Sequence, residues 1–120
     1  MSKILIVDDR PEIRHLLTIT LGSRYEVMNA SDGASGLAAI REHRPKAVLL
    51  DIMMPGEIDG LDVLRIVKSD PELKETFVAL VTSRGQKADY QLGIDLGADA
   101  YFVKPFSPLK VAAWMRERIS

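Results

Sequence analysis

The sequence lacks cysteine, has no apolar run long enough to cross a membrane, and carries almost balanced charge. Without cysteine the chain has no disulfide, thiolate metal ligand or cysteine nucleophile, which suits a reducing compartment. The short apolar runs and the absence of a signal-peptide pattern predict a cytoplasmic protein with no membrane partner. A formal net charge of −1 gives no electrostatic reason to expect direct binding to nucleic acid.

The composition is that of a globular protein. The chain of 120 residues is 47% hydrophobic and 28% charged, which is enough apolar material for a buried core. It contains no internal repeat, linker or low-complexity segment. We therefore expect one domain over residues 1–120.

Short apolar segments alternate with longer amphipathic ones along the chain. Apolar runs that are rich in β-branched residues predict strands at 4–7, 25–30, 47–50, 77–81 and 100–103. Helical spacing of apolar residues predicts helices at 11–21, 33–43, 61–69, 87–97 (ending near Gly97) and 108–119. This alternation predicts an α/β fold, a doubly wound five-stranded parallel sheet with helices on both faces.

Polar residues stand at the carboxyl ends of the predicted strands, where such sheets bind ligands. Asp8 and Asp9 follow the first strand, Asp51 the third, Thr82 the fourth and Lys104 the fifth. Clustered carboxylates repel one another, and a hard divalent cation such as Mg²⁺ relieves that repulsion. The ammonium of Lys104 and the hydroxyl of Thr82 are suited to bind phosphate oxygens. Together with the carboxylates, they predict a site for phosphoryl transfer to an aspartate. Asp51 is the best nucleophile candidate because it ends the most apolar central strand.

Each of these features alone also has a purely structural explanation. Asp9 and Thr82 can cap the helices that follow them, and Lys104-Pro105 can form a turn. Those explanations do not account for the occurrence of all these polar residues at strand ends of one chain. Their joint occurrence favours a site.

The chain resembles the receiver domain of two-component response regulators, including the chemotaxis type, over essentially all 120 residues. The matching motifs are VDD (7–9), LLDIMMP (49–55), DG (59–60), Thr82-Ser83 and FVKPF (102–106). The resemblance implies the flavodoxin-like strand order 2-1-3-4-5. It also implies that Asp51 accepts a phosphoryl group from the phosphohistidine of a sensor histidine kinase or phosphotransfer protein. Such a protein is a switch with Mg²⁺-dependent self-phosphorylation and self-dephosphorylation, and not a metabolic enzyme.

The same resemblance implies a cation site near the phosphorylated residue. Its ligands would be Asp8, Asp9, Asp51 and the backbone carbonyl of Met53. The expected ion is Mg²⁺, and Mn²⁺ is also acceptable.

A phosphate site and a switch follow from the resemblance as well. Thr82 and Lys104 would bind the phosphoryl oxygens, and the Lys104-Pro105 peptide bond would be cis. Thr82 and Phe102 would move after phosphorylation and remodel the face made by the fourth helix, fifth strand and fifth helix. An unknown output partner or domain would read that face.

Some positions differ from the usual pattern of the family. The segment 51–60 holds one extra residue near Glu57, which leaves the shape of this loop open. Ser83 stands where Ala or Gly is common, and Phe102 stands where Tyr is frequent. Arg84, two positions after Thr82, is a candidate to reach over the phosphate.

Two rival functions fit part of the pattern. An aspartate-nucleophile phosphatase on a similar fold usually has a second acid two residues after the nucleophile, where this chain has Met53. A receiver-like module that works without phosphate would not need the acidic set, Thr82 and Lys104. Both rivals are therefore disfavoured.

Trp114 on the last predicted helix has two interpretations. It lies beside the apolar stripe that includes Val111 and Met115. It either packs against the sheet or contacts a partner on the output face.

Overall fold

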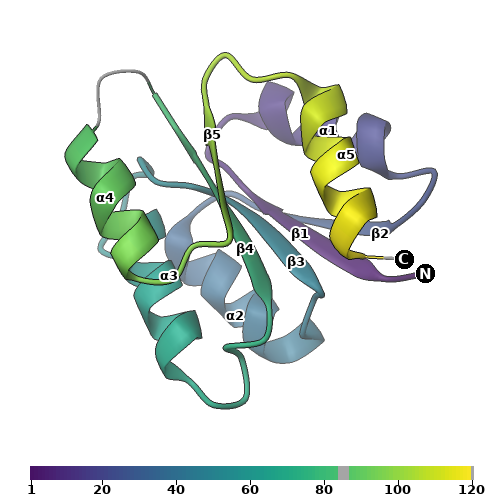
Figure 1. The fold of residues 1–120 in the computed structure, drawn as a ribbon. Coiled ribbons are helices and arrows are strands. Elements are labelled where there is room, and N and C mark those ends of the chain that lie inside the picture. The colour runs from purple at the N-terminus through teal and green to yellow at the C-terminus, as the bar shows by residue number, and fades with distance from the viewer. Residues whose placement is uncertain (84–86, 120) are drawn as a thin grey trace.

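The computed structural model describes residues 1–83 and 87–119, which form alternating strands and helices (Figure 1). The strands are β1 (Lys3–Val7), β2 (Glu26–Ala30), β3 (Ala47–Asp51), β4 (Phe77–Thr82) and β5 (Ala100–Val103). The helices are α1 (Pro11–Leu21), α2 (Gly33–His43), α3 (Gly60–Ser69), α4 (Lys87–Asp95) and α5 (Pro108–Arg118). All neighbouring strands are parallel in the order β2-β1-β3-β4-β5. The predicted doubly wound fold and its strand order are confirmed.

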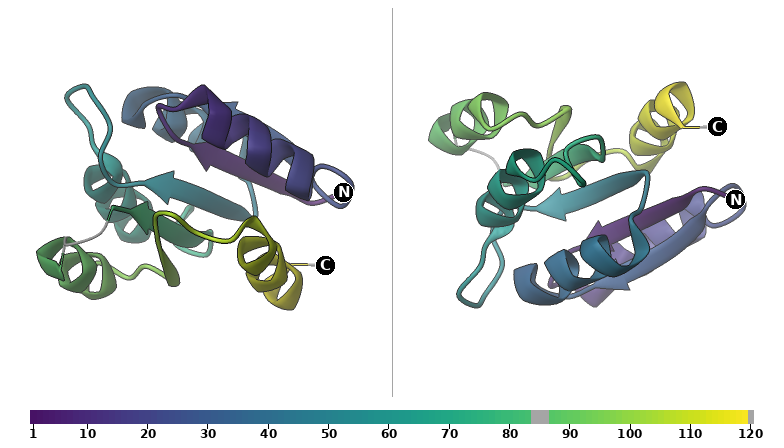
Figure 2. Two further views of the ribbon diagram at one scale, coloured as in Figure 1. Left: turned by 90° about the horizontal axis from the view of Figure 1, so that it is seen from above. Right: turned by 90° about the horizontal axis from the view of Figure 1, so that it is seen from below.

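The strands separate two hydrophobic cores because successive side chains of a strand face opposite sides of the sheet. Ile4 and Ile6 of β1 belong to the core that is covered by α1 and α5. Leu5 and Val7 belong to the core that is covered by α2 and α3. Figures 1 and 2 show helices on both faces of the sheet.

A buried hydrogen bond ties the end of α5 to the turn between α1 and β2. The hydroxyl of Tyr25 donates to the carbonyl oxygen of Ile119 at 3.0 Å. Tyr25 is 2% exposed and Ile119 is 4% exposed. The bond therefore satisfies two polar groups inside the core that lies under α1 and α5.

The helix boundaries follow the capping residues. Asp59 and Asp62 form a capping box at the start of α3, with bonds of 2.9 and 3.1 Å to each other's backbone N–H. Helix α4 ends at Asp95, two residues before the predicted end near Gly97. The early end has a physical cause: Gly97 adopts φ +100 and its N–H bonds back to the carbonyl of Ile94.

The loop between β3 and α3 projects from the body of the protein in both views of Figure 2. It contains Gly56 at φ +110, a conformation that favours glycine. Within residues 1–83 and 87–119, no helix is both long and apolar enough to span a bilayer.

Candidate functional site

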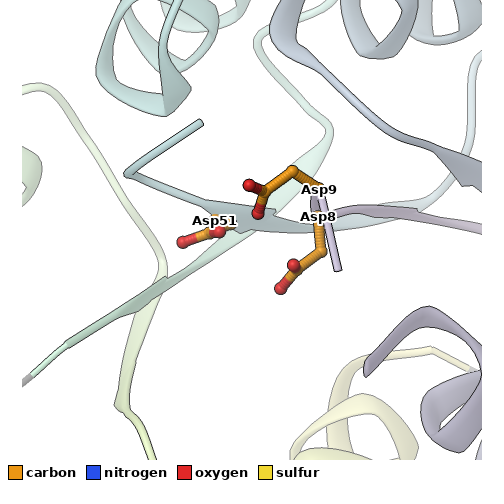
Figure 3. Close-up of side chains that lie close together, drawn as sticks. All are labelled: Asp8, Asp9 and Asp51. Atoms are coloured by element: carbon orange, nitrogen blue, oxygen red, sulfur yellow. The ribbon is translucent and has the colours of Figure 1, made fainter. Parts of the chain in front are cut away.

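The carboxylates of Asp8, Asp9 and Asp51 meet at the carboxyl edge of the sheet (Figure 3). Asp8 and Asp9 directly follow β1, and Asp51 is the last residue of the neighbouring strand β3. One oxygen from each carboxylate lies within 4.8 Å of the others. Asp8 and Asp51 are buried, at 3% and 4% exposure, whereas Asp9 is exposed. The topology thus brings together three residues from two separate segments.

Asp8 is held on several sides by neighbouring groups. Its N–H donates to the carbonyl of Ala30 at 3.1 Å, which extends the β1–β2 pairing by one residue. Its Oδ1 accepts the backbone N–H of Arg10 at 2.9 Å. Its Oδ2 lies 3.3 Å from the Nζ of Lys104. These contacts leave the Asp8 carboxylate little freedom to turn.

Asp51 occupies a buried position in which its ionised form is disfavoured. Burial raises the pKa of Asp51 to about 6, and the negative charge of Asp8 adds to the rise. The Lys104 ammonium and the Met53 N–H, which donates to Asp51 Oδ1 at 3.3 Å, both act in the opposite direction. The group is therefore mainly ionised at neutral pH and is easily protonated below it.

Lys104 supplies the positive charge of the site. Its Nζ lies 3.4 Å from Asp51 Oδ2 and 3.3 Å from Asp8 Oδ2, and its side chain is only 18% exposed. It directly follows β5, and its N–H bonds to the carbonyl of Thr82 at 2.6 Å. The Lys104-Pro105 peptide bond is cis. The ammonium is a compact cation that suits an anionic ligand oxygen.

Thr82 is the last residue of β4, and its side chain is buried at 1% exposure. Its hydroxyl donates to the carbonyl of Ser83 at 3.4 Å, and Ser83 itself is exposed. Arg84, the candidate to reach over a phosphate, lies outside the residues that the structure describes. The carboxyl end of β4 thus contributes one buried hydroxyl to the edge where the aspartates meet.

The donor set fits a hard divalent cation. Among the described residues, Asp8, Asp9 and Asp51 are the group of acidic or imidazole side chains close enough to share an ion. Carboxylate oxygens are the ligands that Mg²⁺ prefers, and Mg²⁺ keeps several waters when only a few protein ligands are present. The exposed position of Asp9 leaves space for such waters. Met53, two positions after Asp51, is 58% exposed.

Phe102 of β5 packs against Trp114 of α5. The two ring centroids are 6.4 Å apart with an interplanar angle of 86°. Phe77 makes a second edge contact with Trp114, with the ring centroids also 6.4 Å apart. The guanidinium of Arg118 lies 4.8 Å from the centroid of the Trp114 ring. Trp114 is therefore half-buried against the sheet, with α5 linked to the end of β5 through aromatic rings.

The extra residue near Glu57 is accommodated in the projecting loop. The loop does not alter the approach of α3 to the site, since the N–H of Gly60 bonds to the carbonyl of Ile52 at 3.1 Å. A Cβ at Gly60 would clash with the carbonyl oxygen of Asp51. The start of α3 therefore lies directly against the backbone of the candidate nucleophile.

One residue at the site was not predicted from the sequence. The Nη1 of Arg14 donates to the carbonyl oxygen of Asp8 at 2.7 Å. The available signal was its place one turn into a helix, because helical side chains lean toward the N-terminus. Arg14 therefore reaches back to the peptide between Asp8 and Asp9.

The family model of the response regulator receiver domain matches residues 4–116. The chain belongs to this family. The receiver domain is similar to the chemotaxis protein CheY4 of Vibrio cholerae, at 30% identity and TM-score 0.88 with 99% of each chain covered. It also resembles the signal receiver domain of a histidine kinase from Syntrophus aciditrophicus, at 27% identity and TM-score 0.90, covering 99% of this chain and 90% of that one. The resemblance found in the sequence is confirmed: this is a receiver domain of two-component signalling, a switch and not a classical enzyme.

The receiver domain also matches full-length regulators. It is 39% identical over 119 residues to the DNA-binding response regulator MtrA of Mycolicibacterium smegmatis. That alignment covers 98% of this chain and 50% of MtrA, so the chain spans about half the length of such relatives. A second MtrA, from Mycobacterium leprae, is 38% identical with similar coverage.

These relatives correct one expectation from the sequence. The net charge of −1 led us to expect no direct role for nucleic acid, yet the MtrA proteins are named DNA-binding regulators. The net charge of −1 describes only the 120 residues of this sequence. It therefore does not describe the half of MtrA that lies outside the alignment with this chain.

Proposed function

We propose that residues 1–120 form one receiver domain and that Asp51 accepts a phosphoryl group from the phosphohistidine of a sensor histidine kinase or phosphotransfer protein. The observation that carries this proposal is the buried Asp51 carboxylate, with Lys104 at 3.4 Å and two further carboxylates beside it. An aspartate that is buried for structural reasons alone would not need an ammonium group and two further carboxylates beside it. A site for moving a dianionic group needs them.

The chemistry requires an ionised carboxylate as the nucleophile. With a pKa of about 6, Asp51 is mostly ionised at pH 7. One of its oxygens attacks phosphorus, the phosphorus–nitrogen bond to imidazole breaks, and the imidazole nitrogen keeps the bonding electron pair. Lys104 then holds one phosphoryl oxygen, and the Thr82 hydroxyl donates to another. Hydrolysis of the acyl phosphate by water returns Asp51 to its starting state.

Asp8, Asp9, Asp51 and the Met53 carbonyl would hold the divalent cation, Mg²⁺ or Mn²⁺. The cation supplies positive charge that offsets the charge on the phosphoryl oxygens. Asp8 is already oriented for this role by the N–H of Arg10. With the cation bound, the three carboxylates would repel one another less.

Phosphorylation would change the surface through Thr82 and Phe102. New hydrogen bonds to phosphate favour one of two arrangements of these side chains. The ring contact between Phe102 and Trp114 supports a path from β5 to α5. We propose that an output segment reads the α4–β5–α5 face. By analogy with the named function of MtrA, we propose that this output binds DNA and that the protein is cytoplasmic.

Incubation with acetyl phosphate and Mg²⁺, followed by intact mass spectrometry, tests the proposal. We expect a gain of one phosphoryl group that is abolished by Asp51→Asn and by a chelator. Asp95→Asn, a matched change at an exposed aspartate of α4, should leave the gain intact. A gain that survives Asp51→Asn would refute the assignment, and turnover of unrelated phosphate esters would indicate a phosphatase instead.

A further inference from the structure

Arg14 makes a short hydrogen bond to the backbone of the acidic pair. Its Nη1 lies 2.7 Å from the carbonyl oxygen of Asp8. A bond from a charged donor at this distance is among the stronger hydrogen bonds in proteins. The side chain is only partly exposed, so water screens the bond incompletely. Arg14 thus fixes the peptide group through which the chain passes from Asp8 to Asp9.

The two aspartates differ in how they are held. The N–H and both carboxylate oxygens of Asp8 have partners in Ala30, Arg10 and Lys104. Among the described residues, the carboxylate of Asp9 has no hydrogen bond or ion pair with another side chain or with the backbone. Figure 3 nevertheless shows the Asp9 carboxylate turned toward Asp51. The direction of Asp9 is therefore set by the backbone that carries it.

We infer that Arg14 is a positioning residue of the cation site. By holding the Asp8 carbonyl, Arg14 fixes the peptide plane before Asp9 and so directs the Asp9 carboxylate to the side of Asp51. Arg14 itself touches neither the ion nor the phosphoryl group. This inference rests on the proposed role of Asp9 as a ligand of Mg²⁺.

The charge and the hydrogen bond of Arg14 act on cation affinity with opposite signs. As a positive charge near the site, Arg14 repels Mg²⁺, so its removal by charge alone would lower the dissociation constant. As a positioning group Arg14 lowers the dissociation constant for Mg²⁺, because a cation site with misdirected ligands binds less tightly. Removal of the positioning bond alone would therefore raise that constant. The sign of the change in Kd therefore separates the two effects.

Arg10 provides the matched control. It lies at the same helix start, and its guanidinium pairs with Glu12 at 3.1 Å while its side chain is 60% exposed. Only the backbone N–H of Arg10 contacts Asp8, so a side-chain replacement removes a nearby charge and keeps that bond. Arg10→Met and Arg14→Met thus remove similar charges, but only the second removes a bond to the Asp8 carbonyl.

The experiment is a titration of the metal-free protein with MgCl₂ by calorimetry, repeated with Mn²⁺ by electron paramagnetic resonance. Circular dichroism first establishes that each variant is folded. We expect Arg14→Met to raise the Kd about tenfold, and Arg10→Met to leave it unchanged or lower it. Arg14→Lys, which keeps a charged donor, should bind nearly as well as the wild type. If Arg14→Met does not fold, Arg14→Gln takes its place under the same criterion, because its shorter side chain loses the reach to the carbonyl.

Either of two results with the variants would overturn the inference: a Kd for Arg14→Met that is equal to or below that of the wild type, or an Arg14→Lys variant as weak as Arg14→Met. If the wild type takes up phosphate at Asp51 while Arg14→Met binds Mg²⁺ normally, the inference fails and the proposed function stands. A wild type that binds no Mg²⁺ refutes the cation site and this inference together.

Discussion

The ammonium group of Lys104 lies 3.4 Å from the carboxylate of Asp51, and both side chains are largely buried. The pKa of Asp51 is nevertheless raised to about 6, because burial and the charge of Asp8 outweigh Lys104. Among the described residues, Lys104 is the cation that most favours the ionised form of Asp51, the form that the proposed nucleophile needs at neutral pH. Lys104 has this role before any phosphate arrives.

Replacing Lys104 should shift the titration of Asp51. We expect Lys104→Met to raise the pKa of Asp51 further, because the lysine is the larger of the two groups that lower it. The rate of phosphorylation by a small donor should fall about 100-fold, as when one charged hydrogen-bond donor is removed from a reacting centre. A carboxyl ¹³C NMR titration in metal-free buffer measures the pKa. Lys110→Met, at an exposed position of α5, serves as the control, and an unmoved Asp51 pKa in Lys104→Met would contradict this account.

The raised pKa of Asp51 also has a consequence for stability. A free aspartate titrates near 3.9, so between about pH 4 and pH 6 the folded chain binds more protons at Asp51 than the unfolded chain does. The free energy of unfolding therefore falls as pH rises through this window, and it levels off above about pH 6. Asp51→Asn should remove the penalty and stabilise the metal-free protein at pH 7 by about 1–2 kcal/mol, after allowance for screening.

Urea unfolding in the presence of a chelator, at pH 4 and pH 7, checks this effect. The difference between Asp51→Asn and the wild type should nearly vanish at pH 4. The exposed Asp95 should show no such pH-dependent gain when it is changed to Asn. An equal stabilisation of Asp51→Asn at both pH values would point to a cause other than ionisation.

The start of α3 should tolerate no added side-chain atom. Gly60→Ala should cost about 2–3 kcal/mol of unfolding free energy, because the new Cβ would clash with the carbonyl of Asp51. It should also slow phosphorylation by displacing Asp51. Gly56→Ala tests conformation alone, since φ is +110 there but no described atom lies within 4 Å of the new Cβ. We expect about 1 kcal/mol for Gly56→Ala, with phosphorylation unaffected, and equal effects of the two variants in urea unfolding would argue against the close contact.

Trp114 should report the switch. If phosphorylation moves Phe102, the edge contact of the two rings at 6.4 Å changes, and with it the fluorescence of the single tryptophan. Phe102→Ala should lose most of the response to acetyl phosphate and Mg²⁺. Tyr101→Phe should keep it, because Tyr101 packs on Tyr90 at the other face of β5. A full response in Phe102→Ala would place the moving group elsewhere.

Much of this architecture could be predicted because the signals are local. Runs such as 47–50 predict a strand, and Pro108 after Ser107 predicts the start of a helix. Because the carboxyl ends of parallel strands lie at one edge of the sheet, the aspartates, Thr82 and Lys104 could be predicted to lie together there. The boundaries were less accurate: Asp51 and Thr82 end their strands instead of following them, since strand pairing continues through both residues.

The remaining features depend on contacts across space. Arg14 reaches the Asp8 carbonyl only because α1 folds back along β1 at one particular angle. Helix α4 is slightly shorter than predicted, because the turn centred on Gly97 begins after Asp95 although Leu96 continues the apolar spacing. The expectation about nucleic acid was wrong for a different reason: a net charge counted over these 120 residues does not describe the half of MtrA that lies outside the alignment.

The bond between Tyr25 and Ile119 joins residues that are 94 positions apart. During synthesis the tyrosine leaves the ribosome long before its acceptor exists. The core between α1 and α5 stays open on one side until the last helix has emerged, because Val111 and Met115 complete it. The face of the sheet under α1 is therefore fully shielded from water only after α5 has been synthesised.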